Sequence, residues 1–85
     1  MIRMILNQKE EDIKTEIEKQ YYWVEVQDIF KYNSSKNIKV TSESQDMASL
    51  VLTGGILLFS LLHPAHNISM MNFNQNFNLF LMLSA

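Results

Sequence analysis

Residues 48–65 read ASLVLTGGILLFSLLHPA, and this stretch decides which fold the rest of the chain can adopt. It contains no charged side chain. As a helix it would extend for about 27 Å, close to the roughly 30 Å thickness of a bilayer's hydrocarbon core. Pro64 cannot continue helical hydrogen bonding, so the helix would end there. We therefore predict an apolar membrane helix over residues 47–66.

The same stretch allows one alternative structure. Gly54 and Gly55 suit a two-residue turn, so residues 50–53 and 56–59 would pair as a β-hairpin. The run is rich in leucine, however, and an isolated hairpin of this composition would expose apolar side chains on both faces. The helix is therefore the preferred prediction.

Charge is confined to the first half of the chain. All seven basic and all nine acidic side chains lie between Arg3 and Asp46, and residues 47–85 contain none. A domain in water normally carries charge over its whole surface, so the second half must be buried in a core, a membrane, a partner or an aggregate. The positive-inside rule would place the first half on the cytoplasmic side of a membrane. The alternative location is the cytoplasm.

The charged head, residues 1–46, contains predicted secondary structure of its own. Asn7 and Glu10 have the spacing of a capping box, which predicts a helix over about residues 8–22. The apolar stripe of this helix consists of Ile13, Ile17, Tyr21 and Val24. Aromatic and β-branched residues follow, and a polar turn at residues 33–37 favours a hairpin over residues 22–41. Residues 41–46 form a linker.

The tail, residues 67–85, is uncharged and rich in Asn and Phe. From position 72 to position 79 every second residue is Asn, alternating with Phe73, Gln75, Phe77 and Leu79, a period of two that is typical of a strand. Side-chain amides would be costly in hydrocarbon, which argues against a second membrane helix. The pattern predicts an irregular or β-prone tail that forms an interface, with a cross-β aggregation element as the alternative.

Together these segments predict a small, mainly α protein with an amphipathic helix, one transmembrane helix and the β-prone tail. The alternative is a small soluble α+β domain with a helix and antiparallel hairpins, in which residues 50–59 pack on Ile13, Ile17 and Val24. A chain of 85 residues allows one small domain, and the absence of cysteine excludes disulfides and thiolate metal sites.

The sequence contains no recognisable catalytic set. His63 and His66 flank Pro64, and no carboxylate accompanies them in the second half of the chain. The proline also disrupts the helical spacing that two metal ligands would need. We expect no enzymatic activity, no metal and no cofactor. The net charge of -2, with basic and acidic residues interleaved, argues against nucleic-acid binding, and no small-molecule substrate is evident.

The expected role is a non-catalytic accessory or assembly subunit of a membrane protein complex, with other subunits or a second copy as partners. One alternative is a soluble protein–protein interaction module of a phage or toxin–antitoxin type, including a homodimeric form. Another is an orphan reading frame with no selected function. The residues predicted to contact a partner or a membrane are Ile13, Ile17, Tyr21, Trp23, Val24, Leu50, Gly54, Gly55, Leu57, Phe59, Phe73 and Phe77.

Overall fold

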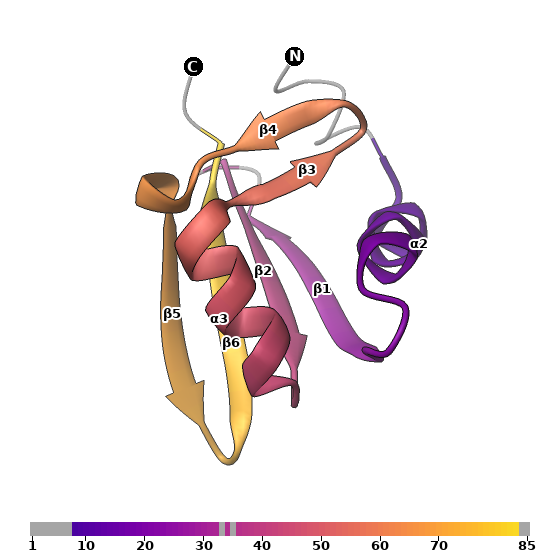
Figure 1. Ribbon diagram of the computed structural model, residues 1–85. Coiled ribbons are helices and arrows are strands. Elements are labelled where there is room, and N and C mark those ends of the chain that lie inside the picture. Colours follow the sequence, from indigo (N-terminus) through magenta and orange to yellow (C-terminus); the bar gives the residue numbers. More distant parts are fainter. Residues whose placement is uncertain (1–7, 33, 35, 84–85) are drawn as a thin grey trace.

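The computed structural model describes residues 8–32, 34 and 36–83. Its main feature is a four-stranded antiparallel sheet with strand order β1-β2-β6-β5, accompanied by a separate two-stranded sheet, β3-β4 (Figure 1). In chain order the elements are α2 (Glu10–Gln20), β1 (Val26–Tyr32), β2 (Asn37–Ser42), α3 (Gln45–Gly54), β3 (Ile56–Leu58), β4 (Leu61–His63), the 3-10 helix η1 (Ala65–Asn67), β5 (Ile68–Phe73) and β6 (Asn76–Met82).

The predicted mainly α fold with a transmembrane helix is wrong. Strands contain more residues than helices, and α3 ends at Gly54 after ten residues. Among the helices that the structure describes, none is long and apolar enough to cross a bilayer. The predicted membrane location therefore loses its structural basis. The alternative, an α+β domain with a helix and antiparallel hairpins, fits the structure.

The four-stranded sheet unites the charged and uncharged halves of the chain. Strand β2, from the charged half, pairs with β6, from the uncharged half, from Asn37↔Met82 to Ser42↔Phe77. The inner face of this sheet, which α3 covers, carries the core (Figure 1). The buried apolar residues come from helices α2 and α3 and from every strand except β4, and include Ile13, Ile17, Ile29, Ile38, Val40, Met47, Val51, Leu58, Ile68, Leu79 and Leu81. The buried residues of the uncharged half thus share one core with those of the charged half.

Helix α3 has a defined beginning and end. The Ser44 hydroxyl accepts a hydrogen bond from the Met47 amide at 3.1 Å, which caps the first turn. Gly55 follows the helix with φ 79° and ψ −170°, a backbone conformation that is almost exclusive to glycine. A Cβ atom at this position would overlap the carbonyl oxygen of His63. The apolar run therefore changes from helix to strand at Gly55, where the sequence analysis predicts a continuous helix.

The hairpin formed by β3 and β4 turns at a different place from the predicted alternative. Leu58 pairs with Leu61, and the two turn residues between them, Phe59 and Ser60, have φ values of 50° and 67°. Positive φ at both central residues is typical of a type I′ turn. Gly54 is the last residue of α3 and Gly55 connects α3 to β3, so neither glycine forms the turn of the hairpin.

The predicted β-prone tail is a hairpin of β5 and β6. Asn74 and Gln75 form its turn, with φ values of 52° and 64°, again as a type I′ turn requires. In the register, Asn72 opposes Phe77 on the inner side of the sheet, whereas Asn76 opposes Phe73 on the outer side. The turn thus distributes the asparagines over both faces, although they alternate regularly in the sequence.

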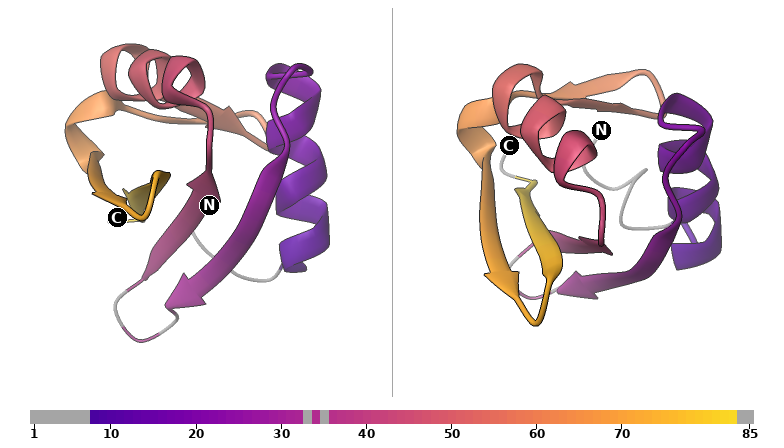
Figure 2. Two further views of the ribbon diagram at one scale, coloured as in Figure 1. Left: turned by 90° about the horizontal axis from the view of Figure 1, so that it is seen from below. Right: turned by 60° about the horizontal axis from the view of Figure 1, so that its bottom comes forward.

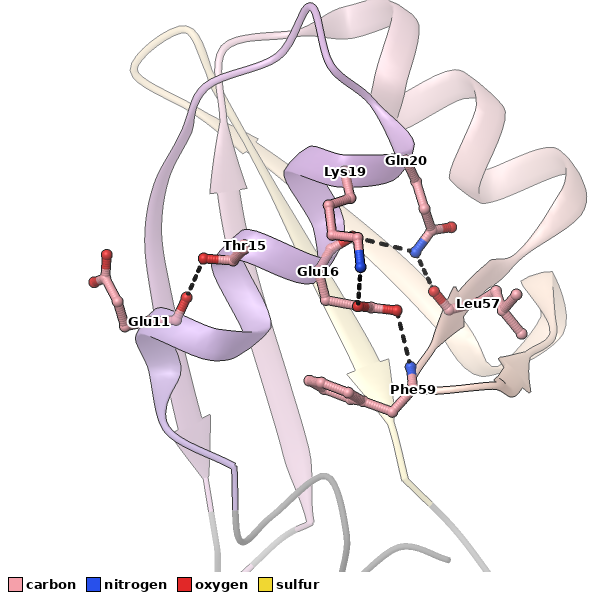
Figure 3. Close-up of polar contacts among 7 residues, drawn as sticks. All are labelled: Glu11, Thr15, Glu16, Lys19, Gln20, Leu57 and Phe59. Atoms are coloured by element: carbon pink, nitrogen blue, oxygen red, sulfur yellow. Dashed lines mark hydrogen bonds and ion pairs between the residues drawn. The ribbon is translucent and has the colours of Figure 1, made fainter.

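Polar side chains of α2 attach this helix to the β3–β4 hairpin (Figure 3). The Phe59 amide donates a hydrogen bond of 3.2 Å to Glu16 Oε2, and Gln20 Nε2 donates to the carbonyl of Leu57. On the neighbouring side, the Val26 amide at the start of β1 donates to Glu18 Oε2 at 2.9 Å. Glutamate and glutamine side chains thereby satisfy backbone groups of the β3–β4 hairpin and of the first residue of β1.

We expect Glu16→Ala to lower the free energy of unfolding by about 1–2 kcal/mol, because the part-buried Phe59 amide loses its charged acceptor. Urea unfolding followed by circular dichroism measures this change. Lys19→Ala is the matched control, since the exposed Lys19 forms only a 3.9 Å ion pair with the other Glu16 oxygen. A surface pair of this kind contributes between about 0 and 1 kcal/mol. Equal losses in both variants would mean that the backbone contact is unimportant.

Candidate functional site

The two histidines lie in different surroundings. His63 ends β4 and is 6% exposed, whereas His66 is exposed in η1. The His63 Nε2 atom is buried and has no hydrogen-bond partner among the described residues. Nowhere among the described residues does the structure bring together three or more His, Cys, Asp or Glu side chains that could hold a metal ion. His63 is therefore best understood as a core residue of the β3–β4 hairpin.

Burial lowers the pKa of His63 below its usual value of about 6.5, because the charged imidazolium loses hydration there. The unfolded chain consequently binds a proton at a higher pH than the folded chain does. Folding stability contributed by neutral His63 is fully present above the unfolded pKa and is lost as pH falls through the folded pKa.

We expect thermal stability to fall as the pH is lowered from 7.5 to 5.5. His63→Leu should flatten this dependence, since the residue that titrates differently in the two states is gone. His66→Asn, at an exposed position, should leave the dependence as it is in the native chain. Differential scanning calorimetry at a series of pH values measures all three proteins. If the thermal stability of His63→Leu depends on pH as that of the native chain does, buried His63 is not the source of the pH dependence.

One open pocket of about 280 Å³ lies next to the aromatic segment before β1. Its lining consists of Trp23, Val24, Glu25, Gln27, Ser42, Glu43 and Ser44. The half-exposed Trp23 ring is contacted edge-on by the rings of Tyr21 and Tyr22. Glu25 and Glu43 are both exposed, so water hydrates their charges. The buried polar side chain in this lining is Ser42, and its hydroxyl already accepts a hydrogen bond of 3.0 Å from the Ser44 amide. The lining therefore lacks the set of convergent polar groups that fixes a small ligand.

The outer face of the four-stranded sheet lies opposite α3, and within the described part of the chain no helix covers it (Figure 2). The cross-strand pairs Phe30↔Lys39 and Lys39↔Phe80 place these residues on that face. The Phe30 ring contacts Tyr32 at 4.6 Å between centroids, and Lys39 Nζ lies 5.9 Å from the Phe30 centroid. Met71, Phe73 and Met82 extend this apolar face toward β5 and are exposed.

Strand β5 is an edge of the sheet, and no other strand among the described residues pairs with its outer side. Every residue from Ser69 to Phe73 is exposed, on both faces of the strand, with Met71 at 60% and Phe73 at 65%. The strand contains no charged residue and no proline, and its register with β6 is regular. Natural sheet edges are commonly protected by charges, prolines or bulges, because free backbone groups pair with other strands. We call the exposed residues 69–73 the β5 edge.

The opposite edge of the sheet, β1, has the protection that β5 lacks. Its register shifts between Val26 and Asp28, and it carries Asp28 and Lys31. Helix α2 also packs beside it (Figure 1). The contrast between the two edges makes the β5 edge the strongest candidate for a functional site.

The predicted contact residues are dispersed over the structure. Ile13, Ile17 and Val24 are core residues, and Tyr21, Phe59 and Phe77 are partly buried against the core. Gly54 is exposed at the end of α3, whereas Gly55 is buried. The other exposed members are Trp23, Leu50, Leu57 and Phe73. Their contact with a partner stays a prediction.

Of the predicted contact residues, Phe73 alone belongs to the β5 edge, and the sequence reasoning missed Met70 and Met71. The signal available in the sequence was an uncharged, β-prone segment that contains two adjacent methionines. Its meaning depends on β5 being an edge strand, which only the topology reveals.

Comparisons of the chain with protein-family models, curated proteins and solved structures gave no significant match.

Proposed function

We propose that the protein is a non-catalytic protein–protein interaction module that binds an extended polypeptide segment by strand addition at the β5 edge. The observation that carries this proposal is the exposure of residues 69–73 on both faces of an uncharged edge strand. Strand addition uses main-chain hydrogen bonds for affinity and alternate side chains for specificity. The β5 edge offers the backbone groups of an edge strand and side chains on both faces.

The side chains of the β5 edge indicate what kind of segment would bind. Ser69, Met71 and Phe73 lie on the outer face, and Met70 and Asn72 lie on the inner side. An added strand would therefore meet thioether and aromatic groups on one face and one thioether and one amide on the other. Methionine adapts its shape to different apolar partners. These contacts favour an apolar, uncharged strand, since a charged side chain would lose hydration without finding an opposite charge.

A synthetic peptide tests this function directly. The probe has the sequence of Ile68–Phe73 with solubilising lysines at each end, and its matched control carries N-methyl groups on alternate amides, which removes backbone donors. We expect the unmodified peptide to shift the NMR signals of the β5 edge amides and to slow their hydrogen exchange, and the methylated peptide to do neither. Shifts confined to the Trp23 pocket, or no shifts at all, would contradict strand addition.

A further inference from the structure

We infer that the strand that binds at the β5 edge is β5 of a second copy of this chain, so that two four-stranded sheets join into one continuous antiparallel sheet. This inference rests on the proposed function and identifies its partner. The symmetry of antiparallel pairing, the distribution of side chains on β5 and the absence of charge from β5 and β6 all favour this partner.

Symmetry limits how two β5 strands can pair. A two-fold axis perpendicular to the sheet exchanges the strands and keeps the outer face outward in both copies. Residues directly opposite one another in an antiparallel pair lie on the same face. Outer-face residues Ser69, Met71 and Phe73 can therefore meet only outer-face residues of the second copy.

The position of η1 selects one register. This short helix ends immediately before Ile68, whose backbone amide already donates to the carbonyl of Ala65 and is therefore not available to a second strand. The available residues 69–73 are centred on Met71. A two-fold axis at Met71 pairs Met71 with Met71 of the second copy, Ser69 with Phe73, and Met70 with Asn72. Each Phe73 ring thereby lies beside a small serine side chain, and the two methionines fill the centre.

The charges of the protein are compatible with this arrangement. Strands β5 and β6 contain no charged residue, and Lys39 on β2 is separated from β5 by the whole of β6. Two strand spacings place it about 10 Å from β5. The analogous pairing through the β1 edges would bring together two copies of a strand that carries Asp28, Lys31 and a bulge. The β5 edge is the one that accepts a second copy without like-charge contacts.

The interface is small. Five residues of strand with the side chains of Met70, Met71 and Phe73 cover less than the roughly 800 Å² per partner of a standard stable interface. We therefore expect a weak, reversible dimer, as is typical of interfaces at the low end of the size range.

Charge substitutions on the symmetry axis test the inference with the full-length chain. In Met71→Lys two like charges would face each other across the axis, and the same holds for Met71→Glu. We expect each variant alone to dimerise at least tenfold more weakly than the native chain, measured by sedimentation equilibrium from about 5 to 500 μM. An equimolar mixture of the two variants should form a heterodimer. Leu62→Lys is the matched control, because Leu62 is another exposed apolar residue on an uncharged hairpin.

The outcomes separate this inference from the proposed function. Weakening in both Met71 variants, recovery on mixing and native behaviour of Leu62→Lys would support the β5 dimer. A dimer that is insensitive to Met71→Lys, a failure of the mixture to associate, or oligomers larger than two would overturn it. If the native chain stays monomeric while the peptide still protects the β5 edge, the second copy is rejected and the interaction module stands. If neither occurs, both proposals fall.

Discussion

Gly55→Ala is expected to lower the free energy of unfolding by at least about 3 kcal/mol. The φ of 79° and ψ of −170° at Gly55 belong to a region that side chains other than glycine rarely adopt, at a cost of about 1–3 kcal/mol. In addition, the new methyl group would overlap the His63 carbonyl oxygen and lie 3.1 Å from Pro64 Cα. Both obstacles are backbone atoms, so relief requires movement of the β3–β4 hairpin. Urea unfolding measures the loss.

Gly54→Ala is the matched control for this prediction. Gly54 is the last residue of α3, and a Cβ there would have no neighbour within 4 Å. Because alanine is the better helix former, we expect no loss and a gain of up to about 1 kcal/mol. Comparable destabilisation of the two variants would show that the change from helix to strand does not occur at Gly55.

Leu58→Arg is expected to unfold the protein. Leu58 is 0% exposed, and a guanidinium group at its position would be buried without an acidic partner among the described core residues. Burial of an unpaired charge costs several kcal/mol, which is comparable with the total stability of a small domain. The expected result is the loss of cooperative thermal unfolding, measured by circular dichroism.

The neighbouring substitution Leu57→Arg should be tolerated. Leu57 is 46% exposed, and exposed surface substitutions usually change stability by less than about 0.5 kcal/mol. The strong difference between two adjacent leucines follows from the alternation of buried and exposed side chains in β3. A membrane helix would predict similar damage from both, so equal effects of the two variants would contradict the strand.

Local patterns in the sequence predicted local structure. The spacing of Ile13 and Ile17 places both on one face of a helix. In the structure both belong to α2 and both are buried. The period of two in the tail predicted strand, and the tail forms β5 and β6. Both signals arise within a few residues, because side-chain direction follows directly from backbone geometry.

Non-local features could not be predicted in the same way. The leucine run at residues 50–62 is apolar in helix and strand alike, so hydropathy did not reveal the break at Gly55. The uneven distribution of charge suggested a membrane segment, but Leu79 and Leu81 of β6 are buried in a core that β6 shares with β2 from the charged half. The β5 edge could not be predicted from the sequence either, because the exposure of Met71 depends on the strand order.

The central claim is that the charged and uncharged halves share one sheet through the pairing of β2 with β6. Thr41 opposes Asn78 on the outer face, and its hydroxyl donates to Asn78 Oδ1 at 2.8 Å. Directly opposite residues of antiparallel strands have the Cα separation that a disulfide needs. The native chain has no cysteine, so an introduced pair reacts without competition.

The most direct test is oxidation of the double variant Thr41→Cys/Asn78→Cys in dilute solution, followed by mass spectrometry of the intact and digested chain. The control is Thr41→Cys/Met82→Cys, whose second position opposes Asn37 and lies about 13 Å along the strand from the Thr41 pairing site. We predict an intramolecular disulfide between positions 41 and 78 and none in the control. Equal crosslinking of both pairs, or none between positions 41 and 78, would contradict the shared sheet.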